Sequence, residues 1–158
     1  AHIDTFAGPA MAITYATPWD PMQHLALVFG DIRDGRSVPV RLHLETVVDD
    51  VFGSHRQLDG MVKRIAEGGR GVIVYLREGS VGVARGTSLR ARQEQLDPRE
   101  DHASAQSREE QWLEIGLGAQ ILRDLGVSTI RIITTRARHY VGLTGFGIEI
   151  EDTEIYDG

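Results

Sequence analysis

The stretch LDGMVKRIAEGGRGVIVYL, Leu58 to Leu76, decides the fold class, because it places a helix directly before a buried strand. Apolar residues recur at i, i+3, i+4 and i+7 in its first part, which predicts a helix over Leu58 to Glu67. Two glycines, Gly68 and Gly69, then end that helix. GVIVYL, Gly71 to Leu76, is an almost continuous apolar run and predicts a strand buried on both faces.

Further elements are expected on both sides of this stretch. HLALVFGDI, His24 to Ile32, and TIRIIT, Thr129 to Thr134, predict two more strands. A second helix is expected over Glu109 to Leu125 with Gly126 as its stop, and a turn into a last strand over Val141 to Ile150. This order predicts an α/β fold, a layered mixed β-sheet flanked by helices.

Two segments are predicted to be irregular. Gly8-Pro9 and Thr17-Pro18 are expected to break any long element among the first 22 residues. Arg90 to Arg108 is polar with Pro98 inside it, which predicts a long loop.

The composition bounds the class of protein. The 158 residues suit a single domain, residues 1–158, and the formal net charge of −6 argues against a general nucleic-acid binder. The absence of cysteine excludes disulfides and thiolate zinc sites. No apolar run approaches the roughly 20 residues of a membrane span. The first residues do not match a signal peptide, so a cytoplasmic protein with no membrane or nucleic-acid partner is expected.

The strand VPVRLHL, Val38 to Leu44, carries an alternating pattern that continues into the next residue. Alternation places Arg41, His43 and Glu45 on one face of this strand. One interpretation is a solvated face of a half-buried strand, and the other is a ligand-binding face.

The segment ETVVDDVFGSHRQLDG, Glu45 to Gly60, concentrates acids and histidine around a Phe-Gly-Ser turn. Such density is typical of a metal or phosphate site. The side chains concerned are those of Glu45, Asp49, Asp50, His55 and Asp59. The competing interpretation is that one of Asp50, Ser54 and Asp59 caps the following helix.

Two further segments have the composition of anion sites. EGSVG, Glu78 to Gly82, follows a buried strand and reads either as a phosphate-binding turn or as a plain turn. TTRARH, Thr134 to His139, lies at the carboxyl end of a predicted strand, where ligands of open α/β sheets bind. Its hydroxyls and two arginines suit a phosphate or a purine edge, and the alternative is a solvated basic loop.

Taken together, these stretches resemble the GTP cyclohydrolase II family of riboflavin biosynthesis. The resemblance runs from about His24 to Ile150 and rests on HLALVFGDIRDGRSVPVRLHLE, DVFGS with the following Arg56, MVKRIAEGGRGVIVYLREG, IGLGAQILRDLGVSTIRIITT and YVGLTGFGIEI. It implies opening of the imidazole ring of GTP, with release of formate and pyrophosphate, at a zinc held by three cysteines. It also implies a homodimer and, in many bacteria, fusion to 3,4-dihydroxy-2-butanone 4-phosphate synthase.

The chain departs from this family at the positions that handle the metal and the chemistry. The family's three cysteines correspond to Thr46, Gln57 and Asp59. The family's active-site tyrosine, its phosphate-binding arginine and the acid before that arginine correspond to Arg92, Leu113 and Gln111. These changes predict no zinc, no other cofactor and no catalytic residue.

Part of the family's nucleotide pocket is kept, as a vestigial substrate-binding set. Its members are Arg41, Glu45, Glu78, Gly79, Thr134 and His139, of which His139 stands in place of the family's lysine. The leading hypothesis is a degenerate domain with a structural, dimerising or regulatory role.

Two alternatives to this hypothesis stay open. One is a module that binds GTP or another purine nucleotide without hydrolysing it, through Arg41, Glu78, Thr134, Arg136 and Arg138. The other is a GTP hydrolase with altered, zinc-independent chemistry, metal-free or with another metal held by the acids and histidine of Glu45 to Gly60.

Overall fold

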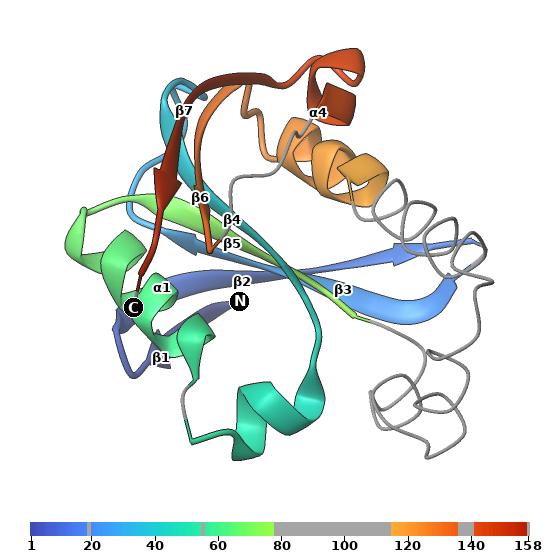
Figure 1. Cartoon of the computed structure of the whole chain (residues 1–158). Helices are drawn as coiled ribbons and strands as arrows, with labels where there is room; N and C mark the ends of the chain where they lie inside the picture. The colour runs from blue at the N-terminus through green and yellow to red at the C-terminus, as the bar shows by residue number, and fades with distance from the viewer. Residues whose placement is uncertain (19, 55, 78–114, 136–140, 158) are drawn as a thin grey trace, which may run out of the picture.

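The computed structural model describes residues 1–18, 20–54, 56–77, 115–135 and 141–157 (Figure 1). The described strands are β1 (His2–Thr5), β2 (Gly8–Thr17), β3 (Asp20–Phe29), β4 (Val38–Leu44), β5 (Gly71–Leu76), β6 (Thr129–Thr134) and β7 (Glu149–Ile155). The described helical segments are the π-helical turn η1 (Val48–Phe52), α1 (Gln57–Glu67), a helix over residues 115–124, and α4 (Val141–Gly145).

These strands form one seven-stranded sheet in the order β1-β2-β3-β5-β4-β6-β7. The pairs β1–β2, β2–β3 and β3–β5 are antiparallel, whereas β5–β4, β4–β6 and β6–β7 are parallel. The sheet is therefore mixed, as predicted, with the antiparallel meander β1-β2-β3 on one side and four parallel strands on the other. The carboxyl ends of β4, β5, β6 and β7 meet at one edge, the usual place for a site in such a sheet.

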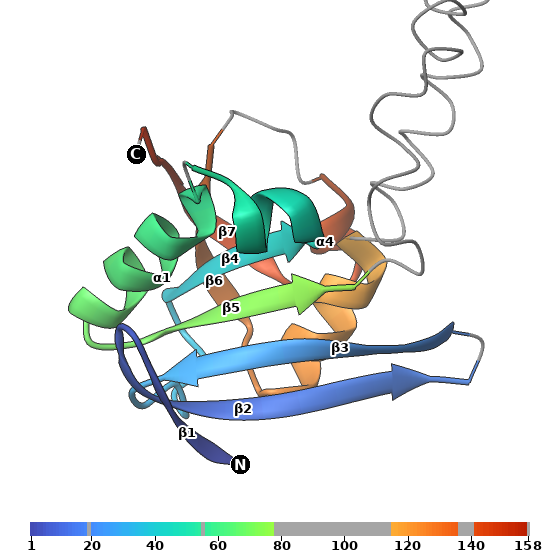
Figure 2. The ribbon, with the colours of Figure 1, turned by 90° about the horizontal axis from the view of Figure 1, so that it is seen from below.

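Helices cover both faces of the parallel half of the sheet, as Figures 1 and 2 show from two directions. On one face, Met61, Val62 and Ile65 of α1 pack in a buried cluster with Ile73 and other apolar residues. On the other face, the helix over residues 115–124 packs against apolar side chains of β4 and β5 that lie on the opposite side of the sheet from Ile73. The run GVIVYL is apolar at almost every position because both of its faces are covered.

Three strands and one helix agree with the sequence prediction. The strands Val38–Leu44, Gly71–Leu76 and Thr129–Thr134 have the predicted bounds, and α1 begins one residue earlier than expected. The chain turns after α1 at Gly69, whose φ is +86°, and after the 115–124 helix at Gly126, whose φ is +78°. Both glycine stops are confirmed.

The prediction for the first 22 residues was wrong. They contain the whole of the ten-residue strand β2 and the beginning of the equally long β3. Gly8-Pro9 starts β2, and Thr17-Pro18 lies where β2 gives way to the turn into β3, so both breaks fall at strand ends rather than inside an element.

The bounds of two other elements differ from those predicted. The strand expected over His24 to Ile32 begins at Asp20 and ends at Phe29, because Gly30 has a φ of +63° and turns the chain. The turn expected at Val141 is the short helix α4, and the last strand runs to Ile155. The predicted loop Arg90 to Arg108 lies outside the described residues.

Candidate functional site

The candidate site lies at the edge where the parallel strands end. The backbone N–H of Glu45, directly after β4, donates to the Leu76 carbonyl at 2.7 Å, which joins the ends of β4 and β5. The Glu45 side chain is 7% exposed and accepts a hydrogen bond from Arg77 Nε at 3.2 Å. Thr134, at the end of β6, is buried at the same edge. Glu45, which one interpretation of the sequence placed on a solvated face, is therefore buried and paired with Arg77.

Arg41 lies on β4, four residues and two pleat repeats before Glu45. Its Nη1 donates to the Ile133 carbonyl of β6 at 3.5 Å, where the ladder between β4 and β6 has ended. His43 is also largely buried. The solvated-face interpretation of Arg41, His43 and Glu45 was therefore wrong, because the segment after β4 folds back over this face instead of leaving it to water.

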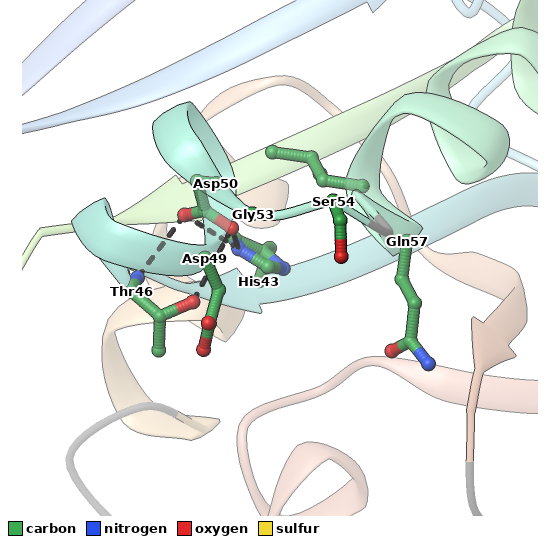
Figure 3. A pocket seen from close by; sticks show the side chains of 8 residues that line it. His43, Thr46, Asp49, Asp50, Gly53, Ser54 and Gln57 are labelled. Carbon is green, nitrogen blue, oxygen red and sulfur yellow. Dashed lines mark hydrogen bonds and ion pairs between the residues drawn. The ribbon is translucent and has the colours of Figure 1, made fainter. Parts of the chain in front are cut away.

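Asp50, in η1, is the centre of a partly buried hydrogen-bond network, which we call the Asp50 network (His43, Thr46, Asp50 and Tyr75) and in which Thr46 is the exposed member. Its side chain is 8% exposed. Its oxygens accept from Tyr75 Oη at 2.7 Å, from the Thr46 backbone N–H at 3.0 Å and from the Thr46 hydroxyl at 3.3 Å. His43 Nε2 lies 2.9 and 3.0 Å from the two oxygens (Figure 3).

The protonation states of this network follow from burial and hydrogen bonding. Burial lowers the pKa of His43 and outweighs the opposing effect of Asp50, so the ring is neutral at pH 7 and Nε2–H donates. Burial acts to raise the pKa of Asp50, but the hydrogen bonds from Tyr75, Thr46 and His43 together lower it. Burial, with Asp50 next, raises the pKa of Tyr75. The network is one carboxylate surrounded by neutral donors rather than an ion pair.

A cavity of about 400 Å³ adjoins the network. Figure 3 shows Thr46, Asp49 and Asp50 on one side of it and Ser54 and Gln57 on the other. Its remaining described lining residues are His43, Gly53 and Leu58. The sequence-predicted residues Arg41, Glu45 and Thr134 are not among the residues that line it, so the edge of the sheet and the cavity are neighbouring but separate features.

The predicted helix cap was wrong. The N-cap of α1 is Arg56, and no side chain accepts a hydrogen bond there. Asp59 lies in the first turn of α1 and pairs with Arg56 Nε at 3.2 Å, while Asp50 bonds backward to the residues before η1. The acids of this segment therefore close the loop itself instead of starting the helix.

The outer surface of η1 is mostly apolar, although Asp49 is also exposed there. Val48, Val51 and Phe52 are exposed, Phe52 by 78%, while Asp50 points inward. This is the reverse of the usual pattern of a surface helix. It arises because the polar side chain of the turn is held by the strands beneath it.

Other predicted site residues lie outside the described residues: His55, Glu78, Gly79, Arg136, Arg138 and His139. Within the described ranges, no three His, Cys, Asp or Glu side chains come together as a candidate metal cluster. The described helices include none with the length and apolar character of a membrane span.

Sequence reasoning did not single out Tyr75 or Arg77. Tyr75 stacks on His43 with ring centroids 5.3 Å apart, and the two are register partners on β5 and β4. Arg77 pairs with Glu45, and its backbone N–H donates to His24 Nδ1 at 3.0 Å. A tyrosine in an otherwise aliphatic buried strand was the one available signal, because a buried hydroxyl needs a hydrogen-bond partner.

Comparison with known proteins decides the family. The profile described as GTP cyclohydrolase II matches residues 1–154. The chain belongs to this family. The fold and the family resemblance expected from the sequence are confirmed.

Two similar proteins show how much of a longer protein this chain matches. The "Monofunctional riboflavin biosynthesis protein RIBA 2, chloroplastic" of Arabidopsis thaliana is 39% identical over 95% of this chain and 32% of its own length. The "Riboflavin biosynthesis protein RibBA" of Mycobacteroides abscessus is 40% identical over 95% of this chain and 39% of its own length. The chain therefore spans about a third of the length of these relatives.

One solved structure is similar over almost the whole chain. It is described as the "Crystal structure of RibBX, a two domain 3,4-dihydroxy-2-butanone 4-phosphate synthase from A. baumannii". The TM-score is 0.63 at 27% identity, covering 99% of this chain and 39% of that one.

Proposed function

We propose that this chain is a GTP cyclohydrolase II-like domain of riboflavin biosynthesis that has lost the cyclohydrolase reaction and has a structural, dimerising or regulatory role. The observation that carries the proposal is the chemistry at the family's three metal-ligand positions. Thr46 donates its hydroxyl to Asp50, Asp59 is paired with Arg56, and Gln57 offers only an amide. A tetrahedral zinc site needs thiolate, imidazole or carboxylate ligands that are free to bind.

The residues present do not fit the family's zinc. A threonine hydroxyl and a glutamine amide are neutral, so they would not balance the charge of the ion as thiolates do. The one carboxylate, Asp59, already has a guanidinium partner. We therefore propose a domain without zinc and assign it no catalytic residue.

The proposed partner is a 3,4-dihydroxy-2-butanone 4-phosphate synthase domain, fused or associated. Similar proteins with "Bifunctional" or "RibBA" in their names support this, and so does the similar solved structure, which is described as a two-domain synthase. The homodimer and the cytoplasmic location belong to the same proposal.

Formate release from GTP, with zinc added, tests the loss of activity. We expect no release above the rate without protein. Release that scales with protein concentration and disappears in Glu45→Gln would contradict the proposal, because Glu45 is the buried acid closest in sequence to the lost ligands. The matched control is Glu149→Gln, an exposed acid at the start of β7, which should leave any such release unchanged.

Metal analysis gives a second and independent measurement. The purified chain is expected to retain less than about a tenth of an equivalent of zinc. A variant with Thr46→Cys, Gln57→Cys and Asp59→Cys, which restores the family's ligand types, is expected to retain zinc. One equivalent of zinc in the unchanged chain would refute the metal part of the proposal.

A second candidate function is non-hydrolysing binding of GTP or another purine nucleotide. The placement of Arg41, Glu45 and Thr134 together at the carboxyl edge of the parallel strands favours it. With Arg41 and Thr134, the set expected for this binding is completed by Glu78, Arg136 and Arg138. Calorimetry with GTP and GDP decides the question: heat that saturates and is lost in Arg41→Ala supports binding, and no heat at millimolar nucleotide removes it.

A further inference from the structure

The segment between β4 and α1 has an unusual construction, because a single buried carboxylate fixes its geometry. Asp50 receives bonds from four donor groups: His43 Nε2, Tyr75 Oη, and the backbone N–H and hydroxyl of Thr46. A carboxylate has about four lone-pair sites, so this acceptor is saturated. A fully satisfied buried charge is stable where a half-satisfied one is costly.

The four donors come from three separate places in the fold. His43 is on β4 and Tyr75 on β5, where they are opposite one another in the parallel ladder. Thr46 begins the loop, and Asp50 follows it by one turn, with its own backbone N–H donating to the Thr46 carbonyl at 2.8 Å. The carboxylate therefore ties the turn η1 to the ends of two adjacent strands.

Thr46 makes two of the four bonds, and its hydroxyl has one hydrogen to give. That hydrogen is directed to an ionised carboxylate, at 3.3 Å from Asp50 Oδ1. A deprotonated ligand at the same place would have no hydrogen to donate and would set a second negative charge beside Asp50. The side chain at this position can serve either as an anionic metal ligand or as a donor to Asp50, but not as both, whereas the backbone N–H donates to Asp50 in either case.

We infer that Thr46 and the Asp50 network close this loop without metal, so that the fold of residues 45–53 is independent of any ion. The inference deepens the proposed function and rests on its zinc-free site. It assigns Thr46 the role of a positioning residue. The family resemblance by itself indicates only that a metal ligand has been lost at this position. It also accounts for the outward apolar face of η1, since Asp50 draws the polar side of the turn inward.

Thr46→Val removes the hydroxyl while keeping the shape of the side chain. We expect its thermal midpoint to fall by about 2 °C, because the bond that is lost is a single exposed hydrogen bond to a carboxylate in a chain of this size. Amide hydrogen exchange in peptides spanning residues 45–53 should accelerate by about tenfold, and exchange in α1 should not change. Tyr75→Phe removes a different donor from the same carboxylate and should accelerate exchange in the same peptides.

The controls separate this role from general damage. Thr46→Ser keeps a donor and should behave as the unchanged chain, while Thr14→Val, on an exposed position of β2, should change neither quantity. Treatment of the unchanged chain with EDTA should leave exchange in residues 45–53 as it was. Unchanged exchange in Thr46→Val, or faster exchange after EDTA, overturns the inference. Formate release by the unchanged chain would refute the proposed function and leave the exchange result standing.

Discussion

Two loops flank β4, and they are held in opposite ways. The loop before it, residues 30–37, depends on backbone conformation: Gly30 and Gly35 both have φ near +65°, at +63° and +66°. The loop after it, residues 45–54, depends on one side chain, the saturated carboxylate of Asp50. The same strand is therefore anchored by glycine geometry at its start and by a buried charge at its end.

Polar side chains are abundant in both loops, but their surroundings differ. In the first loop Arg33 pairs with Asp31 at 2.7 Å, and these side chains are 90% and 60% exposed. Exposed pairs contribute little to stability, since water and salt screen them. In the second loop Asp50 is largely buried, and so is its partner His43 on β4. The density of charged residues in the sequence is therefore a poor guide to how much they contribute to stability. Burial is what distinguishes the charged residues of the two loops.

The largest effect is expected from Gly35→Ala. A Cβ at this position would lie 2.1 Å from the Gly126 carbonyl oxygen, and φ of +66° is itself unfavourable for alanine. We expect a loss of about 3 kcal/mol or more in the free energy of unfolding, measured by urea titration. The matched control is Gly126→Ala, at φ +78° but with open space around it, which should cost only about 1 kcal/mol. Equal losses in the two variants would show that the close approach at Gly35 is unimportant.

The next effect is expected from Asp50→Asn. The amide keeps the shape and one accepting oxygen but puts an NH2 group in place of the other, so the donors at that other oxygen lose their acceptor. Tyr75 and the Thr46 backbone N–H donate to Oδ2, and the Thr46 hydroxyl donates to Oδ1. We expect a loss of about 2 kcal/mol in the free energy of unfolding. Asp31→Asn makes the same chemical change in the exposed loop and should leave the urea midpoint unchanged. If both substitutions behaved alike, the distinction between the buried and the exposed loop would fail.

The smallest effect is the pH dependence contributed by His43. Its pKa in the folded chain is below the ordinary value of 6.5, so the unfolded chain binds more protons as the pH falls through that value. Stability is therefore fully present above about pH 6.5 and declines as the pH falls below it. Thermal midpoints at pH 7.5, 6.5 and 5.5 measure this, and His43→Gln should flatten the decline. A midpoint that rises toward pH 5.5 would contradict a neutral, buried His43.

The sequence predicted the framework well for reasons that are local. Val38–Leu44, Gly71–Leu76 and Thr129–Thr134 have their predicted bounds because an apolar run between glycines or turns has few other conformations. It failed in the first 22 residues, since a Gly-Pro or Thr-Pro pair marks a turn without saying whether the turn ends a strand or interrupts one.

The candidate site was predicted less completely than the framework. Alternation did place Arg41, His43 and Glu45 on one face, and the structure keeps them there. It could not show that residues 46–54 fold back over that face, because a period of two reports which side chains share a side and not what covers them. The partnership of Asp50 with Tyr75, 25 positions along the chain, had no signal in spacing at all.

The sequence by itself determined the α/β class, the bounds of the central strands, the family and the identity of the side chains at the family's metal positions. Those properties are local or compositional, and a linear pattern records them. Only the tertiary structure decided that Glu45 and Asp50 are buried and paired, that Thr46 is a donor, and that η1 turns its apolar side outward. The reason is that a carboxylate has the same chemistry in any sequence, while its burial and its donors depend on which strands the fold sets beside it.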